Sequence, residues 1–416
     1  MLTKLLQLGR KLIIPAIIIV PLSLLLAVLL AEWVIRFAQP QLTYNQAKNV
    51  SLRVSNKSDF LPSDLKPNQE TTHIGNTHEF TYPVKINSLG YRMEEFTIAK
   101  PQNEFRILMI GDSMTFGYGV EERYAIPNQL KEKLNQYLQE KSIDKKIQII
   151  NAGFAAGKAP DTYYLYLEKK GLELNPDLII VNYFLNNDIS DLDDNVWEKV
   201  DQQGLPLKIT SKTTEVEEDY TKLKREYQNW KFAAPILRNS HLWILFATTL
   251  ESRSPQTVTR LKKLFGVRDK LPLVQTLEVE NCLFLNDCSP KMRQLFDRYF
   301  MVSKATVELA KAENIPIIMS LLPANPQVKQ VAQVLGEKTE QNKDSQGSFQ
   351  PQERLKQFFS DQQVEVIDPL SYVTDSSWSK YYYEKDGHPT EKGYTKLSGA
   401  FYDYLIGDWQ ILDKFR

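Results

Sequence analysis

The chain has 416 residues, of which 42% are hydrophobic, so it is long enough to bury one large core or two moderate ones. Lysine and arginine together number 51, as do aspartate and glutamate, and this zero net charge gives no electrostatic preference for nucleic acid or another strongly charged partner. With only two cysteines, the chain is not a disulfide-dense scaffold.

The N-terminal segment has the pattern of a membrane anchor. Residues 1–11 carry basic side chains, and the chain then runs from Leu12 to Ala31 without a charge. At about 1.5 Å per helical residue, this stretch matches a hydrocarbon core of about 30 Å. We therefore predict a single-pass membrane protein with a cytoplasmic basic N-terminus at 1–11, a transmembrane anchor at 12–33, and the remaining chain in the periplasm or at the cell surface. A cleaved signal peptide is the alternative, but the apolar stretch is long for one and lacks a small-x-small cleavage site at its end.

The composition becomes polar between residues 39 and 103. Proline, asparagine, serine and threonine are frequent there, interrupted by short alternating pieces such as Tyr82–Ile86. This composition predicts a linker that ends in a small β-rich lead-in. Within it, Asn87–Arg92 places a turn glycine beside an arginine, a pattern that an ordinary turn would also give.

The stretch Phe105–Gly117 contains the first candidate catalytic residue. Its apolar run Ile107–Ile110 is typical of a strand covered on both faces, and Gly111 allows a sharp turn directly after it. Ser113 is therefore predicted at the C-terminal edge of a strand, where open parallel α/β sheets bind their ligands. The stretch lacks the Lys-Ser/Thr of a phosphate-binding loop and the third glycine of a dinucleotide-binding motif.

The elements that follow alternate between helix and strand. Apolar spacing predicts helices at 125–141, 162–174 and 390–404, and apolar runs predict strands at 147–150, 177–184, 315–321 and 364–368. Such alternation indicates an α/β domain over residues 104–416, with a parallel five-stranded sheet flanked by helices in a flavodoxin-like three-layer arrangement.

Two segments exceed what a minimal version of this fold needs. We predict a mostly helical inserted subdomain at about 191–300, whose segment Leu237–Leu250 is apolar enough to be a core helix, a lid or a membrane-facing surface. Cys282 and Cys288 could close a small loop outside the cytoplasm or remain two buried thiols. The later segment 325–351 is rich in polar residues and is predicted to be an exposed connection.

A nucleophilic serine needs a base and a residue that orients the base. His388 is the one histidine after the last predicted strand, and Asp386 lies two positions before it. The other histidines precede the sheet or lie in the insert: His73, His78 and His241. In a parallel sheet of this order, the His388 turn should share an edge with Ser113, so that His388 takes the serine proton while Asp386 holds its tautomer. An aspartate that caps the closing helix beside a surface histidine is the alternative.

These blocks resemble the signature blocks of the GDSL lipase/acylhydrolase family, also known as SGNH hydrolases. The family's nucleophile is the serine of Gly-Asp-Ser, which corresponds to Ser113. The family also places an oxyanion-binding glycine and asparagine after the second and third strands. By position these are Gly157, with Gly153 as the fallback, and Asn187. The segment Asn87–Arg92 is similar to one found upstream of the hydrolase domain in anchored bacterial members.

The sequence departs from the family pattern in three places. Leu185 stands where the third block usually opens with glycine, the second-block glycine is shifted by a residue, and the last acid lies two rather than three positions before the histidine. The two-residue spacing also resembles anchored bacterial hydrolases and related polysaccharide O-acetyltransferases, so we interpret it as a subfamily mark. The resemblance covers about 105–187 and 364–404.

The resemblance implies a serine esterase or acylhydrolase. Its expected substrates are acyl esters, such as O-acetyl esters, on cell-envelope or exported polysaccharide, on lipid or on small molecules, cleaved through an acyl-serine intermediate. A polysaccharide O-acyltransferase with the same triad, and a non-catalytic envelope binding protein on the same fold, are the alternatives. We expect no metal and no organic cofactor. A metal site at Asp386 and His388 is disfavoured because neither His73 nor His78 shows a ligand motif.

Overall fold

A computed structural model gives the structure of the chain. It describes residues 2–41, 43–45, 55–56, 58–75, 79–154, 158–184, 187–212, 231, 234–264, 282, 288–336 and 346–415. The chain divides into two compact units. The smaller comprises Met1–Asn49 and Asp219–Lys270, and the larger comprises Val50–Glu218 and Leu271–Arg416.

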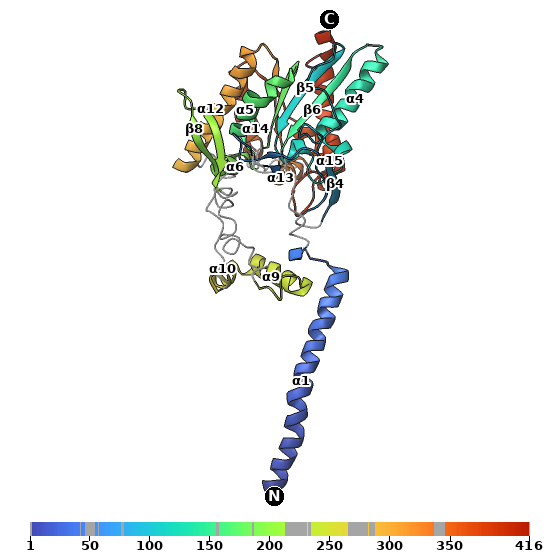
Figure 1. Ribbon diagram of the computed structural model, residues 1–416, viewed down its shortest axis with the longest axis vertical. Coiled ribbons are helices and arrows are strands. Elements are labelled where there is room, and N and C mark those ends of the chain that lie inside the picture. Colours follow the sequence, from blue (N-terminus) through green and yellow to red (C-terminus); the bar gives the residue numbers. More distant parts are fainter. Residues whose placement is uncertain are drawn as a thin grey trace. The chain divides into compact units, whose positions relative to one another are not determined.

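The larger unit is built on a five-stranded sheet in which all neighbouring strands run parallel (Figure 1). Its strands are β5 (Glu104–Gly111), β6 (Lys146–Gly153), β7 (Leu178–Phe184), β10 (Ile317–Leu322) and β11 (Glu365–Ile367). Their order across the sheet is β11-β10-β7-β5-β6, which is the flavodoxin-like order. The predicted α/β fold with a parallel five-stranded sheet is therefore confirmed. The connections change direction between β5 and β7, and ligands of such sheets bind above the strand ends at that point.

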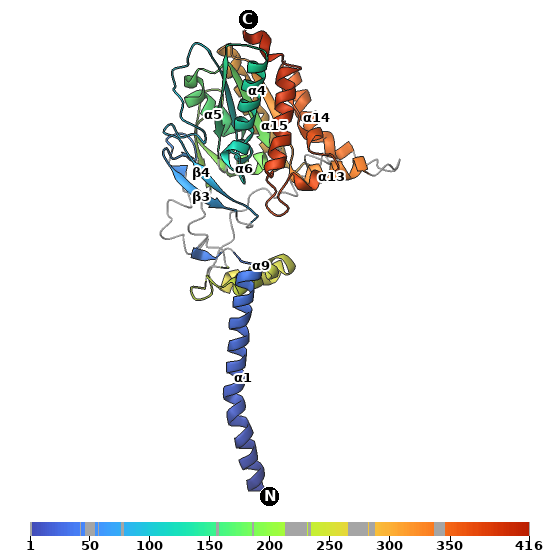
Figure 2. The ribbon, with the colours of Figure 1, turned by 90° about the vertical axis from the view of Figure 1, so that its right-hand side faces the viewer.

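Helices cover both faces of the sheet (Figures 1 and 2). One face is covered by α4 (Ile126–Glu140) and α15 (Glu391–Ile406), and the other by α5 (Pro160–Tyr166) and α12 (Pro290–Ala312). A π-helical turn and a 3₁₀ turn continue α5 to Leu174.

The side chains of β5 alternate between these two layers. Ile107 and Met109 join the core cluster that contains Leu134 of α4, whereas Leu108 and Ile110 join the cluster on the α5 side. All four are fully buried, as the continuous apolar run predicts for a central parallel strand.

Two helices occupy most of the segment that was predicted to be an exposed connection. They are α13 (Asn325–Gly336) and α14 (Gln346–Ser360). The buried side-chain amides of Gln327 and Gln352 donate hydrogen bonds to each other, at 2.5 and 2.9 Å. The prediction was wrong here because two glutamines that satisfy each other can be buried at little cost. Residues 337–345 lie outside the described part of the chain.

The insert at 191–300 is divided between the two units. It begins in the larger unit, with α6 (Asp188–Asp194) leading into an antiparallel hairpin of β8 (Asn195–Val200) and β9 (Pro206–Ser211). The prediction of a mostly helical insert did not anticipate this hairpin. Later in the insert, Cys282 and Cys288 form a disulfide.

The lead-in contains two antiparallel strand pairs. The first joins β1 (Ser55–Asn56) to β2 (Asp64–Leu65), and the second joins β3 (Glu70–Ile74) to β4 (Thr81–Lys85). Tyr82 and Val84 of β4 are buried and alternate with exposed neighbours, so one face of this hairpin packs inside the larger unit, in a core cluster that includes Phe116.

The smaller unit contains α1 (Leu2–Ala38), α9 (His241–Arg253) and α10 (Pro255–Leu264). Within α1, residues Ile18–Ala38 have a mean hydropathy of 2.5 and are not buried. By length and composition this helix can cross a membrane.

Candidate active site

A tight turn at the end of β5 brings Ser113 to the C-terminal edge of the sheet. Asp112 caps the short helix α3 (Ser113–Phe116), because its Oδ1 accepts a backbone N–H of the first turn at 2.9 Å. A glycine is required at position 111, since a Cβ there would lie 2.2 Å from Thr115 Oγ1. The nucleophile candidate thus stands beside the point where the strand connections change direction.

Ser113, His388 and Asp386 form a continuous chain of hydrogen bonds. Ser113 Oγ lies 2.8 Å from His388 Nε2, and His388 Nδ1 lies 2.6 Å from Asp386 Oδ1. The ring and the carboxylate are partly buried, with side-chain exposures of 21% and 11%. The structure therefore brings together the three residues predicted from the sequence, with His388 hydrogen-bonded to each of the other two.

The backbone conformation of Gly387 explains how an acid two positions before a histidine can face its ring. Gly387 has φ +86°, in the left-handed region that glycine adopts without strain. This turn folds the chain back so that Asp386 Oδ1 reaches the imidazole of His388. The turn is closed by the His388 carbonyl, which accepts the Tyr383 N–H at 2.9 Å. The two-residue spacing is thus compatible with an oriented imidazole.

The helix that follows has a cap of its own. Thr390 is the N-cap residue of α15, and its Oγ1 accepts the Gly393 N–H at 3.3 Å. The alternative in which Asp386 is merely the cap of this helix is not what the structure has.

Glu79 holds the Asp386 turn from the lead-in side. Its carboxylate accepts the backbone N–H of Asp386 at 2.8 Å and that of Lys385 at 3.1 Å. Glu79 directly precedes Phe80 and β4, so the lead-in hairpin contributes to the position of the turn. No sequence pattern predicts this contact, because the partners are 307 positions apart.

Tyr118 packs on the imidazole of His388. The ring centroids are 4.5 Å apart, and the Tyr118 hydroxyl lies 2.9 Å from His73 Nε2. Burial raises the pKa of Tyr118 to about 12, which keeps its hydroxyl protonated near neutral pH. His73 therefore contacts Tyr118, and Tyr118 in turn contacts His388. His241 belongs to the smaller unit, and His78 lies outside the described residues.

Arg92 fixes the chain that follows α3. Its fully buried guanidinium donates to the carbonyl oxygens of Phe116, Gly117 and Val120, at 2.9, 2.6 and 2.7 Å. Gly90, two positions before it, has φ +88°, as a turn glycine does. The segment Asn87–Arg92 therefore stabilises the chain that directly follows the turn with Ser113.

The predicted oxyanion donors have different outcomes. Gly157 lies outside the described residues. The fallback Gly153 donates its N–H to Asn151 Oδ1 at 3.0 Å, and this bond occupies the donor. Asn187 stands at the N-terminus of α6, where its Nδ2 donates to Asp191 Oδ2 at 3.1 Å. An amide nitrogen carries two hydrogens, so this bond uses one of them.

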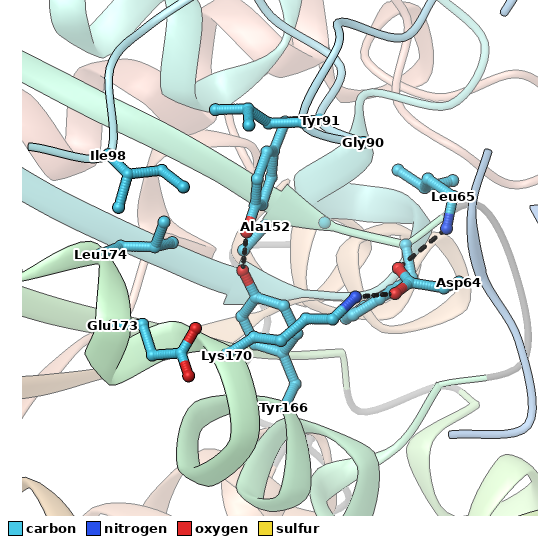
Figure 3. A pocket seen from close by; sticks show the side chains of 13 residues that line it. Asp64, Leu65, Gly90, Tyr91, Ile98, Ala152, Tyr166, Lys170, Glu173 and Leu174 are labelled. Atoms are coloured by element: carbon cyan, nitrogen blue, oxygen red, sulfur yellow. Dashed lines mark hydrogen bonds and ion pairs between the residues drawn. The ribbon is translucent and has the colours of Figure 1, made fainter. Parts of the chain in front are cut away.

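A pocket of about 180 Å³ lies at the end of β6 (Figure 3). Tyr91 and Tyr166 join across it through a hydroxyl–hydroxyl hydrogen bond of 2.9 Å, and Lys170 forms an ion pair with Asp64. Gly153 lines the pocket and also packs against the backbone of α3. None of the three hydrogen-bonded site residues lines it.

The described residues contain no group of three His, Cys, Asp or Glu side chains placed to hold a metal ion.

Comparison with known proteins places solved esterase structures beside this one. No protein-family model and no curated protein matches the chain. A member of the lipolytic protein G-D-S-L family from Veillonella parvula is 12% identical over 73% of this chain and 99% of that one, with a TM-score of 0.33. A psychrotrophic esterase from Pseudoalteromonas sp. is 12% identical over 73% and 98%, with a TM-score of 0.34. An acetyl xylan esterase variant from Geobacillus stearothermophilus is 13% identical over 73% and 94%, with a TM-score of 0.36.

The first of these structures bears the name of the family that the sequence blocks resemble. The chemistry available to this chain follows from the geometry of Ser113, His388 and Asp386.

Asp112 gives the site a pH-dependent contribution to stability. Burial raises the pKa of its carboxyl to about 6, although a backbone N–H of α3 and the nearby His388 favour the charged form. In an unfolded chain the pKa is about 3.9. As pH rises between these values, the unfolded state releases the proton first, so the free energy of unfolding decreases.

We expect Asp112→Asn to increase the stability of the protein, relative to the wild type, more at high pH than at low pH. An amide caps α3 equally well and never becomes charged. The difference in Tm between the variant and the wild type should increase from pH about 4 to about 7. The corresponding change in the free energy of unfolding is at most about 3 kcal/mol. Thermal unfolding of the full-length variant and wild type at each pH measures this difference. Asp375→Asn is the control that should show no such increase, because a hydrogen bond from Tyr381 lowers the pKa of Asp375 and its pH-dependent contribution to stability therefore falls below about pH 4. A difference that stays constant or falls with pH for Asp112→Asn would contradict the assignment.

Proposed function

We propose that the protein is a serine ester hydrolase in which Ser113 is the nucleophile, His388 the general base and then acid, and Asp386 the residue that orients the imidazole. The observation that carries this proposal is the pair of hydrogen bonds, 2.8 Å from Ser113 Oγ to His388 Nε2 and 2.6 Å from His388 Nδ1 to Asp386 Oδ1. These are the distances that proton transfer from a serine through an oriented histidine needs.

The proposed reaction has two halves. His388 donates its Nδ1–H to Asp386, which leaves Nε2 free to accept the Ser113 hydroxyl proton as Oγ attacks the ester carbonyl. The tetrahedral intermediate collapses, the C–O bond to the alcohol breaks, and His388 Nε2–H protonates the leaving oxygen. Water then attacks the acyl-serine while His388 Nε2 accepts a proton from it; the bond between the acyl carbon and Ser113 Oγ breaks, His388 returns the proton to Oγ, and the acid leaves.

The negative oxygen of the intermediate needs hydrogen-bond donors. The Ser113 N–H is suited to this role because it is the first N–H of α3 and has no carbonyl partner within that helix. The Asn187 side-chain amide, which donates to Asp191 and also lies close enough to Asp112 to favour its charged carboxylate, is another donor in our proposal. Gly157 completes the set by the family resemblance.

We infer acyl esters, including O-acetyl groups on carbohydrate, as the substrate class, with lipid and small esters in the same chemistry. No cofactor takes part in this reaction. A polysaccharide O-acyltransferase would form the same acyl-serine and differ only in the acceptor, a sugar hydroxyl in place of water. Supplying a deacetylated oligosaccharide with an activated acetyl ester separates the two, because transfer yields acetylated sugar instead of free acetate.

We also propose that α1 anchors the protein in a membrane. The uncharged run Leu12–Ala31 and the high mean hydropathy of Ile18–Ala38 support this, and the basic side chains that precede the run favour a cytoplasmic N-terminus. The larger unit would then act outside the cytoplasm.

The nucleophile is tested by combining a substitution with a covalent probe. The full chain in detergent should hydrolyse an activated acetyl ester and take up a serine-directed phosphonate at Ser113, located by mass spectrometry. We expect Ser113→Ala to lose turnover by at least about a thousandfold and to lose the adduct, because in this mechanism the acyl group is carried by Ser113 Oγ. Ser360→Ala, an exposed serine elsewhere, should behave as wild type. Wild-type turnover in Ser113→Ala would exclude the proposed mechanism.

The orienting role of Asp386 is tested by an isosteric change. We expect Asp386→Asn to lower turnover by about 10⁴-fold with little change in Tm, because an amide holds the imidazole in the wrong tautomer and does not stabilise its charged form. Steady-state kinetics and thermal unfolding of the two proteins give the answer, with His388→Ala as the reference for a site without a base. If Asp386→Asn retained wild-type turnover while His388→Ala was inactive, Asp386 would have no orienting role.

The orientation of the chain is tested with reporters fused after Arg416. Alkaline phosphatase folds only outside the cytoplasm, so this fusion should be active, whereas a green fluorescent protein fusion exported through the same route should stay dark. Reversed signals would place the larger unit in the cytoplasm and refute the proposed localisation.

A further inference from the structure

The smaller unit ties the end of the anchor helix to helix α9 through one carboxylate. Glu32 of α1 accepts three hydrogen bonds: from Ser240 Oγ at 2.8 Å, from the His241 N–H at 3.0 Å and from the Leu242 N–H at 2.9 Å. The two backbone donors belong to the first turn of α9, whose N-terminus carries partial positive charge. Glu32 thus caps a helix that follows it by more than 200 positions.

The chain directly after α1 makes further contacts with the same helix start. The Gln41 N–H donates to His241 Nδ1 at 2.8 Å, and the Tyr44 N–H donates to the Arg238 carbonyl at 2.9 Å. The Arg238 guanidinium lies 4.2 Å from the centre of the Tyr44 ring. The beginning of α9 is therefore fixed at the C-terminal end of α1, as both views of this unit show (Figures 1 and 2).

These contacts set the depth of α9 relative to the apolar stretch. Glu32 is the first charged residue after the run that begins at Leu12, so it marks the outer end of that run. Trp33 and Phe37, in the next turn, are 60% and 70% exposed, as aromatic side chains at a membrane–water boundary are. An α9 attached at Glu32 begins at the headgroup level.

Helices α9 and α10 form a small core and leave apolar side chains outside it. Ala247 and Val258 are buried between the two helices. By contrast, Phe246 of α9 is 54% exposed, Leu264 of α10 is 78% exposed, and Ile236 just before α9 is 93% exposed. Exposed side chains of this size favour an apolar or interfacial environment.

Basic side chains share these outer faces. Phe246 and Arg253 are seven positions apart, and Arg260 and Leu264 are four apart, so each pair lies on one side of its helix. Between His241 and Leu264 the sequence has four basic residues and one acidic residue: Arg253, Arg260, Lys262, Lys263 and Glu251. Apolar side chains flanked by cations match an anionic lipid surface, where the rings enter the acyl boundary and the cations meet phosphate.

We propose that α9 and α10 lie in the headgroup region of the membrane that α1 spans and bind anionic phospholipid there. This inference rests on the proposed anchor. The protein would then be attached to the membrane by two elements: the membrane-spanning helix α1, and the helix pair α9 and α10 at the membrane surface, which Glu32 holds to α1.

The test uses variants of the full chain that each carry one added cysteine, with the native disulfide left oxidised. The added cysteine carries a fluorophore and is introduced as Phe246→Cys or Leu264→Cys, as Thr248→Cys for a control, or as Leu26→Cys within α1. Thr248 is exposed and lies on roughly the opposite side of α9 from Phe246. The protein is reconstituted into vesicles of phosphatidylcholine, or of an equimolar mixture with phosphatidylglycerol, carrying nitroxide-labelled lipids with the label at the headgroup or deep in the acyl chain.

We expect headgroup nitroxides to quench most of the fluorescence at Phe246 and Leu264 and much less at Thr248, and deep nitroxides to quench Leu26. The quenching at Phe246 should be stronger with phosphatidylglycerol. The double variant Arg253→Glu, Arg260→Glu should lose that extra quenching while Leu26 stays quenched, because only the surface charge has changed.

The outcomes separate the two proposals. If Leu26 is not quenched, the anchor itself is refuted. If Leu26 is quenched but Phe246 is quenched no more than Thr248, the interfacial placement of α9 is wrong. Equal quenching at Phe246 in both lipid compositions would refute the anionic lipid preference.

Discussion

The hydrogen bond between Ser113 Oγ and His388 Nε2 joins two turns that are 275 positions apart in the sequence. Its 2.8 Å length depends on the parallel sheet, because both turns are presented at one edge only when β5 ends abruptly at Gly111. Arg92 then holds the chain after the serine, and Glu79 holds the turn that carries the histidine. The proposed chemistry is thus a product of tertiary packing that neither turn could provide alone.

The sheet could be predicted from sequence because a central parallel strand is covered on both faces, and its residues are then apolar without interruption. Ile107–Ile110 is such a run, and the residues directly after it became candidates by position alone. His388 could be selected because it follows the last strand. The spacing between Asp386 and His388 was the weak point, and it is explained by the left-handed backbone of Gly387, which nothing in the composition specifies.

Other features were beyond sequence reasoning because they depend on partners far away in the chain. Glu79 and Tyr118 reach the histidine turn from the lead-in and from the segment after α3, and each looks like an ordinary polar or aromatic residue by itself. Glu32 looks like the flank of an apolar helix until α9 is present to be capped. The polar composition of 325–351 led to a wrong prediction of exposure, because polar side chains can be buried when they form hydrogen bonds with each other, as Gln327 and Gln352 do.

The Gly387 turn has a consequence for how the site is aligned. Asp386 and His388 are carried by the same few atoms of backbone, so the carboxylate and the imidazole are assembled locally and travel together when that loop shifts. The hydrogen bond between His388 and Ser113, by contrast, joins two turns that are far apart in the chain, so a shift of the loop would change its length. The distance between Ser113 and the imidazole therefore depends on where this loop lies relative to the sheet edge. Glu79 of the lead-in is one of the groups that hold the loop there, because its carboxylate accepts the backbone N–H of Asp386.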